Sequence, residues 1–92
     1  MNMNNFPLGV ATHVADVPGY RGSASLYRLA PPLEGHEHVV VSAAVVLFVG
    51  PETVVVPADT SGCVLHATRL PGSTEGTLSH ADALFMAGYR IQ

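Results

Sequence analysis

The chain has 92 residues, a formal net charge of −3, one cysteine and no tryptophan. This length fits one domain, because two domains would each be too small to bury an adequate core. A composition that is 48% hydrophobic and 12% charged excludes a disordered acidic tail, and one cysteine excludes an intrachain disulfide. The negative net charge argues against a protein that binds nucleic acid by neutralising its phosphates, so we expect no nucleic-acid partner.

The first 22 residues predict an N-terminal extension, partly flexible, which precedes a single α+β domain over residues 23–92. Prolines and glycines interrupt this segment, and only residues 10–14 alternate apolar and polar side chains as a strand does. Residues 1–6 have neither the basic nor the apolar region of a signal peptide. The longest apolar stretch, residues 39–49, is shorter than the roughly 20 residues of a membrane-spanning helix, so we expect no membrane partner.

Valine-rich runs predict strands in the middle of the chain. A strand over residues 25–30 should end at Pro31 and Pro32, because proline cannot donate to a ladder. Residues 38–49 predict the strongest strand, since their β-branched valines disfavour a helix. One face of this strand is wholly apolar, and the other changes from polar to apolar, as expected of a strand that begins in solvent and runs inward.

The rest of the chain predicts shorter elements. Residues 50–52 should form a tight connection, residues 53–56 an antiparallel strand, and residues 59–62 a turn. A strand over residues 63–70 and an exposed loop over residues 71–77 should follow. Ser79 predicts a helix N-cap with Asp82 three residues later, and Gly88 a left-handed helix end.

With residues 89–91 as an edge strand, these elements predict an α+β fold. We expect a small antiparallel β-meander sheet of four to five strands, with one short C-terminal helix packed on it.

Histidines and the cysteine suggest a metal site. His36 and His38 would share one strand face, a common beginning of a zinc site, and Cys63 and His66 could complete four ligands. However, Cys63 and His66 are three residues apart on a predicted strand and so should point to opposite faces. We therefore expect no metal and no other cofactor, and we expect Cys63 to be buried as a small apolar residue. A metal-binding domain or metal-dependent hydrolase that uses His36 and His38 is the alternative.

No set of residues in the sequence has the spacing expected of a catalytic group. Ser79, His80 and Asp82 lie together at one helix start, and capping already explains two of them, so we expect no enzyme. Tyrosine and arginine dominate protein–protein hot spots because they combine contact area with a polar group. The candidates for protein interaction are Tyr20, Arg21, Tyr27, Tyr89 and Arg90.

About two-thirds of the chain resembles a family of small proteins of unknown function that actinobacterial phages, especially mycobacteriophages, encode. The likeness begins with residues 26–32 and becomes dense after Val40. It rests on the segments 41–43, 50–53, 57–59 with Gly62, 70–73, Gly76, Leu78, His80, 83–84 and 87–89. The family has no established catalytic residues, so the resemblance transfers none.

The resemblance implies a non-enzymatic phage accessory protein that acts in the host cytoplasm. Its expected activity is binding of a host bacterial protein, with inhibition of a host process or of host growth as the consequence. A minor virion structural protein is another alternative. We also expect a homodimer, because one short helix covers only part of a sheet face and the chain carries little charge to keep two copies apart.

Overall fold

The computed structural model describes residues 9–92, which form a mixed six-stranded sheet and one short helix. Residues 1–8, part of the predicted extension, lie outside the described residues. Among the described residues, no helix has the length and apolarity needed to cross a membrane. The elements are β1 (Gly9–Asp16), β2 (Ser23–Leu33), β3 (His36–Val46), β4 (Gly50–Pro57), β5 (Thr74–Glu75), α1 (His80–Met86) and β6 (Tyr89–Ile91).

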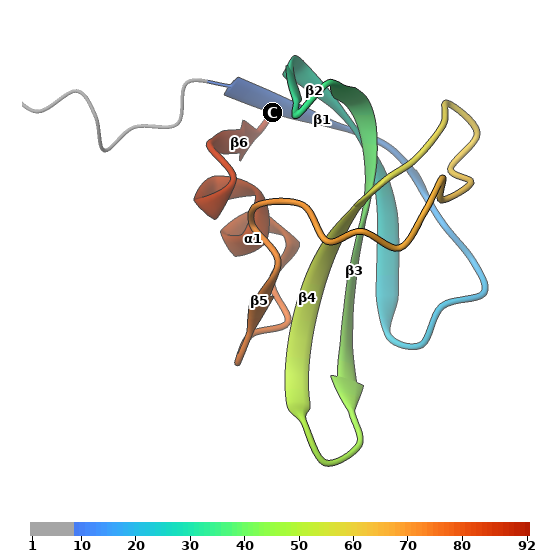
Figure 1. Ribbon diagram of the computed structural model, residues 1–92, viewed down its shortest axis with the longest axis vertical. Helices are drawn as coiled ribbons and strands as arrows, with labels where there is room; N and C mark the ends of the chain where they lie inside the picture. Colours follow the sequence, from blue (N-terminus) through green and yellow to red (C-terminus); the bar gives the residue numbers. More distant parts are fainter. Residues whose placement is uncertain (1–8) are drawn as a thin grey trace, which may run out of the picture.

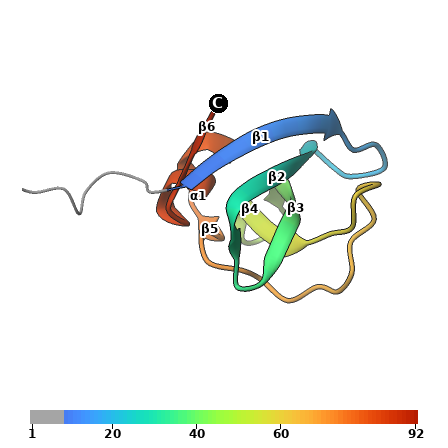
Figure 2. The ribbon, with the colours of Figure 1, turned by 90° about the horizontal axis from the view of Figure 1, so that it is seen from above.

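The sheet has the strand order β5-β4-β3-β2-β1-β6 and is antiparallel except where β1 pairs with β6. It curls strongly, so that α1 lies beside β6 at the open side of the curl (Figures 1 and 2). The α+β class is as predicted, but the sheet is larger and mixed. The difference arises at the ends of the chain, where β6 joins β1 in a parallel pair.

Strand β1 includes residues that the sequence assigned to an extension. It pairs with β2 on one side, from Val10↔Ala30 to Asp16↔Ser25, and with β6 on the other. Residues 9–16 are therefore an internal part of the sheet. Val17, which follows the strand, packs against the apolar cluster on the outer face.

The prediction that Pro31 and Pro32 end the second strand is wrong, because β2 continues to Leu33. The pairing with β3 passes from Arg28↔His38 to Leu33↔His36 with a register shift. Neither proline has a ladder partner in β1 or β3. The backbone N–H that proline lacks is therefore not required for strand pairing at either position.

The β3–β4 hairpin turns earlier than predicted. Strand β3 ends at Val46, residues 47–49 form the turn, and Gly50 opens β4 as the partner of Val46. Phe48 (φ 67°) and Gly50 (φ 100°) adopt the left-handed conformation there. The predicted inward course of this strand is also wrong, because its middle is buried and its far end leaves the core as a projecting hairpin (Figure 1).

Residues 63–70 form no strand, contrary to the prediction. They follow the edge of β4 through separate backbone hydrogen bonds, from Leu65 N to Pro57 O and from Leu70 N to Val55 O, and one isolated bridge joins Val64 to Ala58. The following loop contains the short strand β5, which pairs with β4. This segment closes much of the β4 edge without a regular ladder.

Two apolar clusters occupy the two faces of the sheet. The inner cluster lies between the curled sheet and α1, where Leu84 is fully buried. The outer cluster combines Leu26, Val40 and Val56 with Ala24 and Ala58. Each face of the sheet thus has a buried cluster formed within one chain, while the far end of the β3–β4 hairpin stays exposed.

The helix begins as its sequence predicts. The Ser79 hydroxyl accepts a hydrogen bond from the Asp82 N–H at 3.1 Å, which satisfies one of the free N–H groups of the first turn. Gly88 follows the helix at φ 101°, a conformation with little steric cost for glycine. The chain then enters β6, the predicted edge strand.

Candidate functional site

A hydrogen-bonded polar cluster lies at the end of the inner face, where β1 and β2 meet the start of α1. Cross-strand pairs His13↔Tyr27, Ser25↔Val41 and Ser23↔Ala43 set the register that brings its side chains together. Tyr27 and Val41 belong to the inner apolar cluster on the same face of the sheet. The members of the polar cluster are His13, Asp16, Ser23, Ser25, Tyr27 and His80.

His80 is the centre of this cluster. Its Nε2 atom lies 3.0 Å from the Ser23 hydroxyl, and its Nδ1 atom lies 3.1 Å from the Tyr27 hydroxyl. The rings of Tyr27 and His80 also meet edge to face, with centroids 6.0 Å apart. Both nitrogens of the imidazole are therefore engaged by hydroxyl groups from β2, which orients the ring.

Asp16 organises the other half of the cluster. Its carboxylate oxygen Oδ1 accepts from the Ser25 hydroxyl at 3.2 Å and lies 3.0 Å from Nε2 of His13. The His13 ring packs edge to face on Tyr27, with centroids 5.6 Å apart. Tyr27 thus stands between two histidines, one on β1 and one on α1.

The environment separates the protonation states of these groups. Burial lowers the pKa of His80 below 6.5, so the imidazole is neutral at neutral pH. Burial also raises the pKa of Tyr27, which keeps the phenol protonated. The hydrogen bond with His13 holds the pKa of Asp16 below its ordinary value, and Ser25 adds to this effect. The arrangement combines a carboxylate, a neutral imidazole and hydroxyl groups.

An apolar hairpin tip projects from the same sheet. Phe48 is 98% exposed and Leu47 is 74% exposed, and Val45 and Val49 are also exposed. Phe48 combines this exposure with a positive φ, which is unusual for a bulky side chain. Residues 38–51 contain no aspartate, glutamate, lysine or arginine, so the tip presents an uncharged apolar surface.

The proposed metal ligands do not gather into a site. The rings of His36 and His66 approach, with centroids 5.9 Å apart, while His38 lies beside Glu37 at 3.9 Å. Across residues 9–92, no group of three or more histidine, cysteine, aspartate or glutamate side chains could hold a metal ion. Cys63 is exposed, which corrects the prediction that it is buried, because it follows the turn at the molecular surface rather than lying on a strand.

The predicted interaction residues divide between the core and the surface. Tyr27 and Tyr89 are each only 4% exposed, and the Tyr89 hydroxyl donates to the carbonyl of Pro31. Tyr20 and Arg21 are exposed in the β1–β2 loop, and Arg90 is exposed on β6. Two of the five candidates therefore have their rings in the core and three offer surface.

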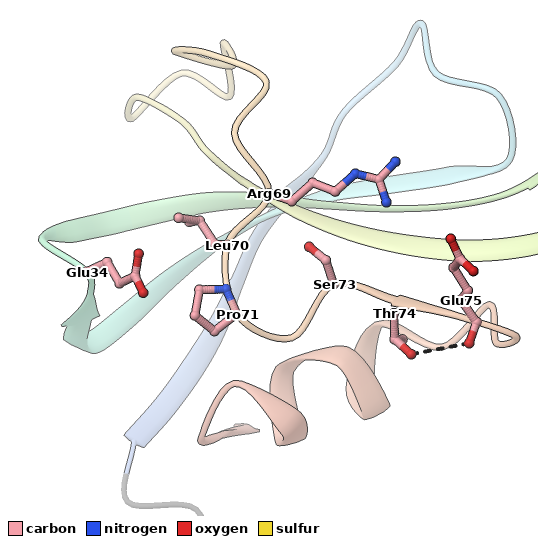
Figure 3. Close-up of a pocket in the computed structure, with 7 residues that line it drawn as sticks. All are labelled: Glu34, Arg69, Leu70, Pro71, Ser73, Thr74 and Glu75. Atoms are coloured by element: carbon pink, nitrogen blue, oxygen red, sulfur yellow. Dashed lines mark hydrogen bonds between the residues drawn. The ribbon is translucent and has the colours of Figure 1, made fainter.

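A shallow surface pocket of about 630 Å³ lies between the β2–β3 turn and the segment that leads into β5 (Figure 3). Glu34 and Glu75 stand at its two ends, with Leu70 and Pro71 between them. Arg69, which also lines it, donates to both carboxylate oxygens of Glu52 at 3.2 and 3.3 Å. The pocket holds no nucleophile paired with a base.

The sequence did not predict the polar cluster: Tyr27 was selected as an interaction residue, and His80 was considered only together with Ser79 and Asp82. His80 and Ser23 are 57 residues apart in the sequence, and no local spacing connects them. Comparison of the chain with protein-family models, curated proteins and solved structures gave no match.

Proposed function

We propose that the chain is a non-enzymatic protein-binding module whose β3–β4 hairpin tip inserts into an apolar pocket of a partner protein. The observation that carries this proposal is Phe48, a bulky aromatic side chain that is almost fully exposed at a left-handed backbone position. An exposed apolar group without a packing role, held in a costly conformation, is typical of a recognition site. With the predicted phage setting, the partner is a host bacterial protein of the cytoplasm.

The chemistry of the tip favours a protein pocket over an anionic lipid surface. No arginine or lysine lies within residues 38–51, and the chain as a whole carries a net charge of −3. Anionic membranes attract basic segments, and this hairpin offers none. A pocket in a protein can instead enclose Leu47 and Phe48, and burial of each such side chain contributes roughly 1.5–3 kcal/mol.

The experiment compares the wild-type chain with Phe48→Asn and with a matched control, Phe85→Asn. Phe85 is also exposed, at 54%, but lies on α1. Each protein is immobilised for capture from host lysate, and the captured partner is then purified for calorimetric titration against all three chains. We expect Phe48→Asn to weaken binding by at least about 2 kcal/mol, or roughly 30-fold, the size of a hot-spot loss. Phe85→Asn should bind like the wild type.

Light scattering of the same three proteins tests whether the hairpin tip binds a second copy of this chain instead. If the wild type is a homodimer and Phe48→Asn is a monomer, the tip binds a second copy of this chain and the proposed partner is wrong. Equal affinity of wild type and Phe48→Asn for the purified partner would likewise overturn the proposal. Circular dichroism establishes that each variant is folded before binding is compared.

A further inference from the structure

We propose that Ser23 is a modification site whose hydroxyl, with His80 as general base, accepts an acyl group from an activated ester or thioester. The pair has the geometry that such a step needs, because the Ser23 oxygen lies 3.0 Å from His80 Nε2. Ser23 is exposed at the first position of β2, where a small acyl donor can reach it. This inference is independent of the hairpin tip and of its partner.

In the proposed step, Tyr27 holds the tautomer of His80 whose free electron pair faces Ser23. When Nδ1–H donates to the Tyr27 oxygen at 3.1 Å, Nε2 is unprotonated and faces the serine hydroxyl. The Tyr27 ring is fixed in the inner core, with 4% of the residue exposed. Tyr27 is thus a positioning residue, in the role that a carboxylate has in a serine triad.

The protonation state of His80 suits a base. Its burial favours the neutral ring, and the titratable groups around it are His13 and Asp16 on β1 and Tyr27 on β2. A hydrogen bond with the Ser23 backbone opposes the effect of burial and raises the pKa of His80, His13 lowers it, and Asp16 raises it to a lesser extent. A neutral imidazole at neutral pH can accept the serine proton without first losing one of its own.

The loop before Ser23 holds the serine in place. Gly22 adopts φ 68°, and a Cβ atom there would meet the Ala43 carbonyl oxygen at 2.1 Å. Only glycine permits this approach of the loop to β3, and it sets the position from which Ser23 begins the β2–β3 ladder. Tyr20 and Arg21 are exposed in the same loop and come shortly before Ser23 in the sequence.

The step balances without a further reactant. A bond forms between Ser23 Oγ and the carbonyl carbon of the donor, as the serine proton passes to His80 Nε2. The bond from that carbon to the leaving phenol or thiol breaks, and the leaving group takes the proton from His80. The products are O-acyl-Ser23, a free phenol or thiol, and neutral His80.

The experiment uses p-nitrophenyl acetate as the acyl donor and a Cys63→Ala background, which removes the one thiol, itself exposed. The chain has no lysine, so competing amine acetylation is confined to the N-terminus. Trypsin cleavage after Arg21 and Arg28 isolates a seven-residue peptide that contains Ser23 and Ser25, and tandem mass spectrometry assigns the acetyl group between them. We expect acetylation at Ser23, lost in Ser23→Ala and slowed at least about 100-fold in His80→Gln.

The pH profile separates catalysis by His80 from a structural role. The rate at Ser23 should rise with pH and reach a plateau with an apparent pKa below 6.5, while His80→Gln should show no such step. Tyr27→Phe should slow the reaction in part, because the ring loses its Nδ1 partner. Ser61→Ala is the matched control, since this exposed hydroxyl bonds to Asp59 and not to a histidine, and it should leave the rate at Ser23 unchanged.

A second measurement covers the case in which fast deacylation removes the adduct before it can be detected. Ser23→Cys in the Cys63→Ala background should react with iodoacetamide faster at pH 7 than wild-type Cys63, because His80 promotes the thiolate. The proposal is overturned if acetylation is spread evenly over the serines, if His80→Gln reacts like the wild type, or if the introduced thiol is no faster than Cys63.

Discussion

Replacement of Phe48 by asparagine should stabilise the fold. A left-handed conformation costs a bulky L-residue about 1–2 kcal/mol, whereas asparagine tolerates it better through its short polar side chain. Phe48 has φ 67° and is 98% exposed, so its removal sacrifices almost no burial. We therefore expect the free energy of unfolding to rise by about 1 kcal/mol.

Thermal denaturation followed by circular dichroism measures this effect. For a domain of this size, 1 kcal/mol corresponds to a rise in Tm of about 4–8 °C. Phe48→Gly should give a smaller gain, because glycine adds roughly 0.5–1 kcal/mol of conformational entropy to the unfolded chain.

Leu47→Asn is the matched control for the asparagine substitution. Leu47 is 74% exposed in the same turn and has no positive φ, so its replacement should change stability by less than about 0.5 kcal/mol. A loss of stability in Phe48→Asn, or an equal gain in Leu47→Asn, would refute the argument from backbone strain. A gain in stability together with a loss of partner binding would show that the tip is kept for recognition.

Two further predictions concern the polar cluster and its supporting loop. Gly22→Ala should cost more than about 2 kcal/mol in chemical denaturation, because it combines a positive φ with a backbone clash at Ala43; Gly19→Ala, which meets nothing within 4 Å, should cost about 1 kcal/mol. Stability should also fall as the pH drops below 6.5 toward the lower pKa of folded His80, because the unfolded chain binds that proton first. His80→Gln should remove this component of the pH dependence, and an unchanged profile would contradict it.

The elements predicted well from sequence are those whose signals are local. The turn after Asp59 forms because its carboxylate accepts from the Ser61 and Cys63 N–H groups, and the helix begins where the Ser79 hydroxyl caps it. Each of these contacts joins residues at most four positions apart, so the sequence itself contains both partners. The same holds for Gly88, where a left-handed helix end requires little beyond glycine.

The elements predicted wrongly depend on distant pairing. Pro31 and Pro32 fit within β2 because a register shift leaves them without ladder partners, and residues 63–70 stay irregular because they bond to β4 one group at a time. Apolar patterning placed residues 38–49 on one strand, but it cannot distinguish a buried strand end from an exposed hairpin tip. Phe48 is exposed because β3 ends at Val46 and the hairpin turn extends beyond the core.

The sequence by itself determined the α+β class, the valine strand, the capped helix and the edge strand, because side-chain periodicity and capping act over a few residues. Only the tertiary structure decided the curl of the sheet, the parallel pairing of β1 with β6, and the meeting of Ser23, Tyr27 and His80. Those three side chains come from β2 and α1, and no local pattern encodes the distance between them. Their cluster exists because burial of the inner face brings the start of the helix against the start of the strand.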